Sequence, residues 1–224
     1  MMKKFKILYE DRDLFVIYKP HGLAVQSARP TVPDVMSQLA NELFERTGKR
    51  MQLYLVNRLD QPVEGIFLVA ANEKAAADLN RQVNDHAYME KYYQALVSGK
   101  LPQKEGALVD YLAKDSRTNM SRVVQKGTKD GKRSELRYKV LQEWEEVSLL
   151  EIQLLTGRHH QIRVQLSHAG VPIVGDTKYG PSVNGGDQQL CLCSCKTAFV
   201  HPRTKKQMTF QVEPGFSVPS TIPG

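Results

Sequence analysis

Short apolar runs alternate with polar turns along the whole chain, and most of them have the two-residue period of β-strands. The alternation is clearest in residues 134–154, where apolar side chains occupy every second position in two successive runs. Strands are predicted at Phe5–Tyr9, Leu14–Tyr18, Tyr54–Val56, Ile66–Ala71, Tyr92–Val97, Leu190–Cys195 and Met208–Val212, and within 134–154.

Three segments have the helical period instead. Residues 31–47 repeat apolar positions at i and i+4, with Thr31 and Asp34 as a predicted capping box and Gly48 as the stop. A second helix is predicted from a cap at Asn72 to about His86. A third is predicted over roughly 158–168, after the turn at Thr156-Gly157.

This order of elements predicts an α/β chain of the α+β type. Strands that follow each other closely favour antiparallel pairs, so we expect a mixed, mostly antiparallel sheet with flanking helices. There is no internal repeat and no evident linker, and we expect a single domain over residues 1–224.

Composition narrows the class of protein. The chain has 224 residues, a net charge of +7 and 41% hydrophobic residues, which is ordinary for a globular protein and argues against disorder. No apolar run is long enough to cross a membrane, and the lysine-rich start lacks the apolar core of a signal peptide. Three cysteines within five residues predict a reducing, cytoplasmic location.

The positive charge is concentrated in residues 114–139, which hold nine basic and three acidic residues. Such an uneven field favours a polyanion, because each neutralised phosphate releases counterions. The alternative is a solvated basic loop without a partner. No zinc-finger or RNP-type pattern accompanies the charge, so sequence-specific base reading is not indicated.

Two segments are dense in chemically active side chains. Residues 57–65, with Asp60, form a polar turn between two apolar strands, and residues 157–163 open the third helix with Arg158 and Arg163. Arginine and the positive end of a helix both keep a nearby carboxylate ionised, and such a carboxylate is able to act as a nucleophile. A structural ion pair between the two segments is the alternative reading.

Several motifs in order resemble the RluA-type pseudouridine synthases. The opening strand pair ends in Lys19-Pro20-His21-Gly22, and Arg58-Leu59-Asp60 lies in the position of the family's catalytic segment. Lys91-Tyr92-Tyr93-Gln94-Ala95 is similar to a K-x-Y-x-A motif, and residues 157–180 match the family's most specific block. The terminal strand and the His201-Pro202 turn complete the resemblance.

The resemblance implies a pseudouridine synthase fold with a central active-site cleft and Asp60 at its floor. It implies that Asp60 is the catalytic carboxylate, that Tyr93 stacks on uracil and assists proton transfer, and that Arg163 pairs with Asp60. Substrate binding falls to Arg58, Ile162, Arg158 and His160. The family needs no metal and no cofactor. The implied partner is tRNA or large-subunit rRNA, and we expect a monomer without a membrane.

Four departures from the family pattern lie near these residues. Asn57 replaces a histidine, Val63-Glu64 replaces Thr-Ser, His159 replaces a threonine, and Cys193-Ser194 replaces His-Ala. Glu64 adds a negative charge close to where phosphates are expected. These changes leave open a non-catalytic RNA-binding or ribosome-assembly factor on the same fold. A glycosidase-like hydrolase is a more distant alternative, because paired carboxylates are not evident.

The remaining signals have plainer explanations. Cys191, Cys193 and Cys195 share one strand face without zinc spacing, so we expect small buried residues there rather than a metal site. Asp176 is expected to accept backbone N–H groups in a structural turn. The motifs begin at the first residues, which predicts no separate N-terminal RNA-binding module and slightly favours a tRNA stem-loop as substrate.

Overall fold

The computed structural model describes residues 4–27, 31–85, 88–180 and 189–219. Its contacts divide the chain into two compact units, one of residues 1–90 and 194–215 and one of residues 91–193 and 216–224. Each unit is described by itself. The single catalytic domain expected from the sequence stays a prediction.

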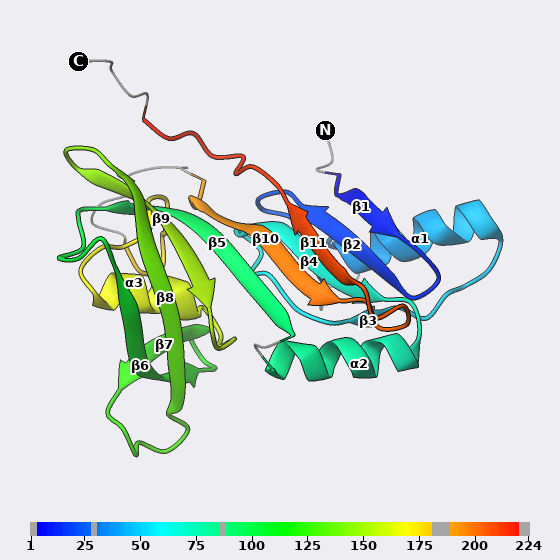
Figure 1. The fold of residues 1–224 in the computed structure, drawn as a ribbon, viewed down its shortest axis with the longest axis horizontal. Coiled ribbons are helices and arrows are strands. Elements are labelled where there is room, and N and C mark those ends of the chain that lie inside the picture. Colours follow the sequence, from blue (N-terminus) through cyan, green and yellow to red (C-terminus); the bar gives the residue numbers. More distant parts are fainter. Residues whose placement is uncertain (1–3, 28–30, 86–87, 181–188, 220–224) are drawn as a thin grey trace. The chain divides into compact units, whose positions relative to one another are not determined.

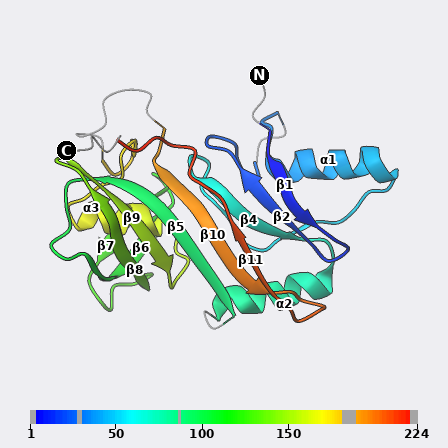
Figure 2. The same cartoon turned by 45° about the horizontal axis from the view of Figure 1, so that its top comes forward.

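The first unit is built on an antiparallel arrangement in which β4 pairs with β2 and β2 pairs with β1. The short β3 also pairs with β4, and β10 pairs with β11. Figures 1 and 2 show these strands with α1 and α2 beside them. The elements are β1 (Lys6–Glu10), β2 (Leu14–Lys19), α1 (Val35–Thr47), β3 (Tyr54–Leu55), β4 (Glu64–Ala70), α2 (Glu73–Asn84), β10 (Leu192–Val200) and β11 (Gln207–Gln211).

The core of the first unit lies between its strands and α2. Apolar side chains of β2, β4 and β10 that are fully buried pack against the buried face of α2, which includes Ala75 and Leu79. The period-2 pattern of the strands and the i, i+4 pattern of α2 therefore serve one shared core, as the sequence predicts.

The helix caps of this unit are partly as predicted. Asn72 caps α2 by accepting the Ala75 N–H, and Gly48 ends α1 with a left-handed φ of 67°. The capping box at Thr31 is wrong, because α1 begins at Val35 and Asp34 is its N-cap, accepting the Ser37 N–H at 2.8 Å. The Asp34 carboxylate also accepts the Ser27 N–H, so this side chain fixes the approach to the helix as well as its first turn.

The second unit is a five-stranded antiparallel sheet in the order β5-β9-β8-β6-β7, with one helix (Figure 1). The helix packs on the sheet through Gln165, whose side chain donates to the Leu108 carbonyl oxygen. The elements are β5 (Met89–Ser98), β6 (Glu105–Asp115), β7 (Met120–Val124), β8 (Lys132–Glu143), β9 (Val147–Leu154) and α3 (Gln161–His168). The first two residues of β5 belong to the first unit.

Two strands of this unit were not predicted. β6 and β7 pair with each other over Tyr111–Asp115, and β6 pairs with β8 over Glu105–Leu112. Their sequences carry charges and a glycine in place of a clean alternation. The basic segment 114–139 is therefore mostly strand, with turns at residues 116–119 and 125–131. Whether it binds a partner stays a prediction.

The third helix begins later than predicted. His160 has a positive φ of 53°, which removes residues 158–160 from the helix and makes Gln161 its first residue.

The α+β class and the mixed, mostly antiparallel sheet with few helices are confirmed. Cys191, Cys193 and Cys195 are buried, as expected for small core residues. In the described parts of the chain, no helix has the length and apolar character needed to cross a bilayer.

Candidate active site

Asp60 lies in the first unit, on the extended segment between β3 and β4. Leu59 is buried and anchors the segment, whereas the neighbouring Arg58 is exposed and Asp60 is half-buried. This alternation places Arg58 and Asp60 on the more open side of the segment, as an extended conformation requires. The turn that follows is closed by the Val63 N–H, which donates to the Asp60 carbonyl oxygen at 3.0 Å.

The turn after β2 holds the Asp60 segment by its backbone. Lys19 is fully buried, and its Nζ donates to the carbonyl oxygens of Pro20, Leu23 and Gln61 at 3.2, 2.7 and 2.9 Å. The Gly22 N–H also donates to the Gln61 carbonyl oxygen, and the Gln61 side chain donates back to the Gly22 carbonyl oxygen. A buried ammonium is tolerated when its protons have acceptors, and here three carbonyls supply them.

A second bond to this segment comes from His21, whose Nδ1 lies 2.7 Å from the Pro62 carbonyl oxygen. Because a carbonyl only accepts, Nδ1 carries the proton. The two residues that follow Asp60 are thus each fixed through their carbonyl groups. This arrangement can hold a carboxylate in one orientation during a reaction.

β4 approaches β10 closely where it leaves the Asp60 turn. Gly65 has a φ of 116°, and a Cβ atom at this position would lie 2.4 Å from the Ser194 carbonyl oxygen. Only glycine fits such a backbone and such a separation.

Tyr93 lies in the second unit on β5, opposite Ile152 of β9. It is buried, as are Lys91 and Met89, whereas Glu90 is exposed and Tyr92 is half-buried. Alternate residues of a strand point to opposite faces, so Lys91 and Tyr93 share one face of β5.

Arg163 lies in the first turn of α3 and is buried. Its Nε and Nη2 donate to the two carboxylate oxygens of Asp176, each at 2.8 Å, and its guanidinium carbon lies 5.2 Å from the centre of the Tyr179 ring. Asp176 Oδ1 also accepts the N–H groups of Lys178 and Tyr179, which confirms the predicted turn. The sequence prediction missed that Asp176 also orients Arg163. The sequence offered one sign of this contact, because Asp176 lies in residues 175–180 of the same family block that contains Arg163.

Ile162, the residue before Arg163 in α3, is also buried.

The two histidines before α3 stack on each other, with ring centres 3.8 Å apart. His160 Nδ1 lies 2.8 Å from the Tyr179 hydroxyl, and that hydroxyl accepts the Ser121 N–H. The Ser121 hydroxyl contacts the His159 carbonyl oxygen and lies 2.9 Å from His159 Nδ1. These bonds fix the start of α3 to β7.

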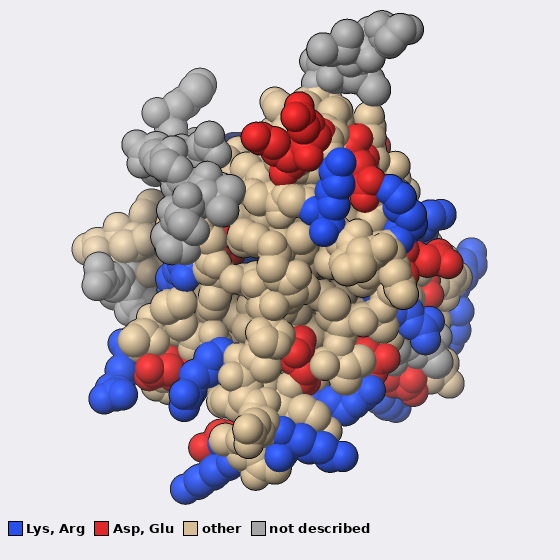
Figure 3. Space-filling view, turned by 90° about the vertical axis from the view of Figure 1, so that its left-hand side faces the viewer, with Lys and Arg blue, Asp and Glu red and all other residues tan. Residues whose placement is uncertain are grey.

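Exposed cations surround the ends of β6, β7 and β8 in this unit. Two more from distant parts of the sequence join them, because Arg158 donates to the Arg133 carbonyl oxygen and Lys178 donates to the Asn119 carbonyl oxygen. In Figure 3, Lys and Arg predominate along the lower end of the face, the end at which the β7–β8 connection lies in Figure 1. The exposed cations are Lys114, Arg117, Arg122, Lys126, Lys129, Lys132, Arg133, Arg158 and Lys178, here called the basic end.

Comparison with known proteins decides the family. The RNA pseudouridylate synthase family model matches residues 13–168, which is more than half of the chain. The chain belongs to the RNA pseudouridylate synthase family. An RNA pseudouridine synthase of Bacillus subtilis, YlyB, described as uncharacterized, is 32% identical over 92% of this chain and 67% of its own length.

Other relatives agree with this assignment. The ribosomal large subunit pseudouridine synthase C of Yersinia pestis is 36% identical over 92% of this chain and 64% of its own length. The chain thus spans about two thirds of the length of these relatives. A solved structure, human RNA pseudouridylate synthase domain containing 4, has a TM-score of 0.75 and 20% identity, and covers 93% of this chain and 88% of the human chain. This likeness confirms the fold. The chain is an RNA pseudouridine synthase of the RluA type.

Three departures from the pattern of this pseudouridine synthase family have structural partners. The Asn57 side-chain oxygen accepts the Leu68 N–H of β4, and the Ser194 hydroxyl donates to the Ile66 carbonyl oxygen of the same strand. His159 stacks on His160 as described above. All three changes reinforce the frame around the motifs.

Glu64 is the fourth departure, and its charge is not offered to a substrate's phosphates as the sequence suggested. The side chain is 2% exposed, and it accepts the Gly215 N–H at 2.7 Å and the Tyr18 hydroxyl at 3.2 Å. Glu64 thus ties the segment after β11 to the start of β4, within the first unit.

An acidic and basic cluster that the sequence reading missed joins the β1–β2 turn to the β10–β11 turn of this synthase. His201 Nε2 contacts Asp11 at 2.8 Å, while its Nδ1 accepts the N–H groups of Arg203 and Thr204. The Arg203 guanidinium binds both oxygens of Asp13. Although Asp11, Asp13 and His201 lie close enough to share a cation, these bonds already use the atoms that would bind one. The cluster therefore has a structural role, because it joins the two turns. Its residues Asp11, Asp13, His201 and Arg203 are called the lock below.

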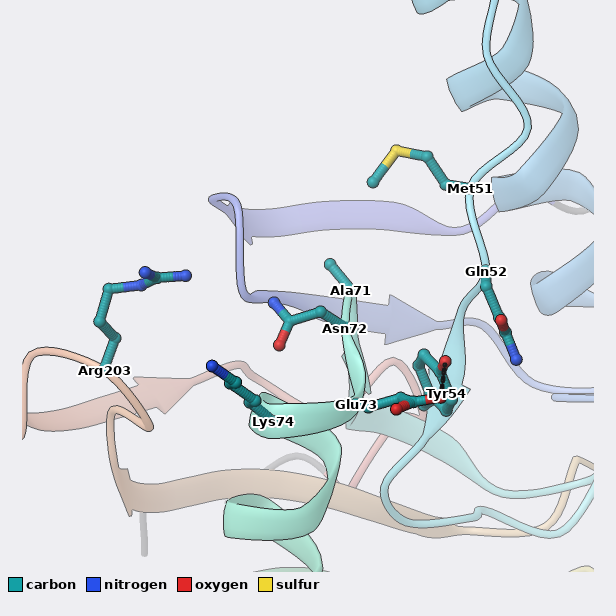
Figure 4. A pocket seen from close by; sticks show the side chains of 8 residues that line it. All are labelled: Met51, Gln52, Tyr54, Ala71, Asn72, Glu73, Lys74 and Arg203. Carbon is teal, nitrogen blue, oxygen red and sulfur yellow. Dashed lines mark hydrogen bonds between the residues drawn. The ribbon is translucent and has the colours of Figure 1, made fainter.

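A pocket of about 630 Å³ lies next to this lock, where β4 runs into α2 (Figure 4). Across it, Tyr54 donates to Glu73, while Arg203 and Lys74 point in from the other side. The seven residues of β4 separate the pocket from the Asp60 turn, which corresponds to roughly 20 Å. The lining residues are Met51, Gln52, Tyr54, Ala71, Asn72, Glu73, Lys74 and Arg203.

Proposed function

We propose that this synthase isomerises uridine to pseudouridine in structured tRNA or large-subunit rRNA, with Asp60 as the catalytic carboxylate. The observation that carries the proposal is the fixed Asp60 segment, whose next two residues are held at their carbonyls by Lys19, Gly22 and His21. The family match over residues 13–168 includes this segment.

The reaction is an isomerisation that balances without a further reactant. The bond from uracil N1 to ribose C1′ breaks, a bond from C5 to C1′ forms, C5 loses its proton and N1 gains one. The base must first leave the stack, which costs a few kcal/mol and favours an unpaired loop in a folded RNA. Asp60 either adds to C1′ while uracil departs as an anion, or adds to C6 of the ring.

We assign roles to four residues around Asp60. Tyr93 stacks on uracil and assists proton transfer at C5, and Arg163 pairs with Asp60 while Asp176 holds its other edge. Ile162 packs against the base. Arg58, exposed two residues before Asp60, enters the RNA stack.

RNA backbone binding is assigned to the basic end. Its cations are exposed and are supplied by several elements, which suits a run of phosphates rather than a single anion. Arg158 belongs to this surface. His160 precedes the helix that carries Arg163 and is bonded to Tyr179, so it acts on substrate through its neighbours.

The test is tritium release from RNA that carries uridine labelled at C5, comparing wild type with Asp60→Asn. We expect the variant to release no tritium and to bind the same RNA with nearly unchanged affinity. Undiminished release by Asp60→Asn would overturn the assignment of Asp60. Absence of release by the wild type from both tRNA and rRNA of the source cell would favour the non-catalytic RNA-binding alternative.

The choice of RNA is tested by mapping pseudouridines with and without the gene. The Yersinia pestis relative is named for the ribosomal large subunit, which supports the rRNA half of the proposal. The site that disappears from the map identifies the target nucleotide.

A further inference from the structure

Among the residues that the structure describes, two lysines are buried, and their surroundings differ. Lys19 donates to three carbonyl groups, so its burial is compensated within the fold. Lys91 is 5% exposed, and in the described parts of the chain its Nζ makes no hydrogen bond or ion pair. Burial lowers the pKa of Lys91, with no neighbouring charge contributing.

A largely buried amine without a counter-charge works against folding, because its charged form has lost most of its water and has no neighbouring charge to offset the loss. Such groups are enriched at functional sites, where the substrate supplies the counter-charge when it binds. Position supports this reading for Lys91. It projects from the same face of β5 as Tyr93, two residues further along, and is part of the K-x-Y-x-A motif.

We propose that Lys91 contacts the uracil of the everted uridine and binds an oxygen of the base that becomes negative when the N1–C1′ bond breaks. This rests on the proposed function, in which Tyr93 stacks on the same base. A uracil oxygen fits better than a phosphate, because phosphates of an everted nucleotide stay near solvent whereas Lys91 is almost fully buried.

The assignment has a kinetic consequence. The charge on the base is largest in the transition state, so Lys91 should act mainly on the rate of the chemical step and little on RNA affinity. It also has a consequence for stability. Removing a largely buried amine that has no counter-charge should leave the fold at least as stable, whereas removing Lys19, which has three carbonyl acceptors, should not.

The experiment compares Lys91→Met and Lys91→Arg with two matched variants. Lys19→Met removes a buried lysine that has partners, and Lys100→Met removes an exposed lysine shortly after β5. For each protein we would measure the single-turnover rate of tritium release, the Kd for the RNA at several salt concentrations, and the midpoint of urea unfolding.

We expect Lys91→Met to lower the single-turnover rate by about tenfold to a hundredfold. Its Kd should stay within about twofold and its unfolding midpoint should be equal to wild type or higher. Lys91→Arg should recover part of the rate, because it restores the charge. Lys100→Met should resemble wild type, and Lys19→Met should unfold at lower urea.

Three results would overturn the proposal. An unchanged single-turnover rate in Lys91→Met would rule out a contact between Lys91 and the reacting base. A lower unfolding midpoint with a parallel loss of rate makes Lys91 a packing residue. A weaker Kd with a salt slope reduced by about one makes it a phosphate contact. Failure of the proposed function is distinguished from these, because the wild type would then release no tritium.

Discussion

Arg163 and Asp176 form a buried bidentate ion pair, in which Arg163 Nε and Nη2 each lie 2.8 Å from one carboxylate oxygen of Asp176. The side chains are 4% and 0% exposed, so neither charge can be hydrated if the other is lost. The same carboxylate closes the turn at residues 176–179. One residue therefore fixes both the turn and the arginine that we assign to catalysis.

The first prediction concerns this pair. Asp176→Asn should lower the free energy of unfolding by about 3–5 kcal/mol, because it removes the buried carboxylate that binds the Arg163 guanidinium through two atoms. Turnover of folded protein should fall as well, since Arg163 loses its fixed orientation. Urea unfolding and tritium release measure the two effects. As a control, Asp115→Asn removes half of an exposed pair with Arg117 and should change stability by less than about 1 kcal/mol.

Wild-type stability in Asp176→Asn would contradict the structure around Arg163. Normal stability in the Asp115→Asn control is needed to attribute the effect to burial rather than to loss of one negative charge.

A second prediction tests the close approach of β4 and β10. Gly65→Ala places a Cβ atom 2.4 Å from a Ser194 backbone atom at a φ of 116°, and backbone has little room to yield. We expect a loss of about 3 kcal/mol or more in unfolding free energy. Gly48→Ala is the matched control, because Gly48 also has a positive φ but has nothing within 4 Å of the new atom. It should lose only about 1–2 kcal/mol.

Equal losses for the two glycine variants in urea unfolding would mean that backbone strain alone explains the cost. The separation between β4 and Ser194 would then be larger than the structure indicates.

The sequence predicted the elements that have a strong period. The runs around Leu14, Ile66, Leu136 and Leu150 appear as β2, β4, β8 and β9, since each has one face in a core. It missed β6 and β7 because Lys114 and Arg122 interrupt the apolar pattern on strands that have an exposed face. A lysine on a solvent-facing strand position costs little, so charge alone is a poor sign of a loop.

For the candidate site, the sequence predicted the residues but not their partners. Asp60, Tyr93 and Arg163 were found through motifs, and their roles stay predictions. The Asp176 partner of Arg163, and Glu64 with Gly215, were not foreseen, because contacts between residues 13 and 151 positions apart depend on the folded backbone. Local patterns carry no record of such pairs.

A third prediction addresses the basic end. Replacing Lys126, Lys129 and Lys132 by Gln should weaken RNA binding at low salt and lower the slope of log Kd against log salt concentration by about two. The rate of tritium release at saturating RNA should stay near wild type, because we assign these lysines to the RNA phosphates and not to the reacting base. Matched Gln replacements at the exposed Lys6, Lys49 and Arg50 remove the same charge elsewhere.

If both triple variants reduce the salt slope equally, net charge and not the basic end governs RNA binding. Slopes measured over several salt concentrations make this distinction, whereas a single Kd does not.

The last prediction follows from the lock beside the pocket. The Arg203 guanidinium, with further help from Asn72, lowers the pKa of Asp13 to about 2. A carboxyl whose pKa is lowered by folding stabilises the protein above its unfolded pKa of about 3.9, and this contribution disappears as the pH falls towards 2. Arg203→Gln removes the largest cause of the shift. Because Arg203 is half exposed and solvent screens the pair, we expect only a small loss of stability at pH 7.

The pH dependence is the informative part of this test. The difference in unfolding free energy between wild type and Arg203→Gln should be constant from pH 7 to about 5 and should shrink between about pH 4 and 2, as Asp13 takes up its proton in both proteins. Arg81→Gln, which removes an exposed partner of Asp78, should differ little from wild type throughout. A wild-type to Arg203→Gln difference that persists unchanged at pH 2 would mean that Arg203 stabilises the β10–β11 turn through packing, and that Asp13 is not its electrostatic partner.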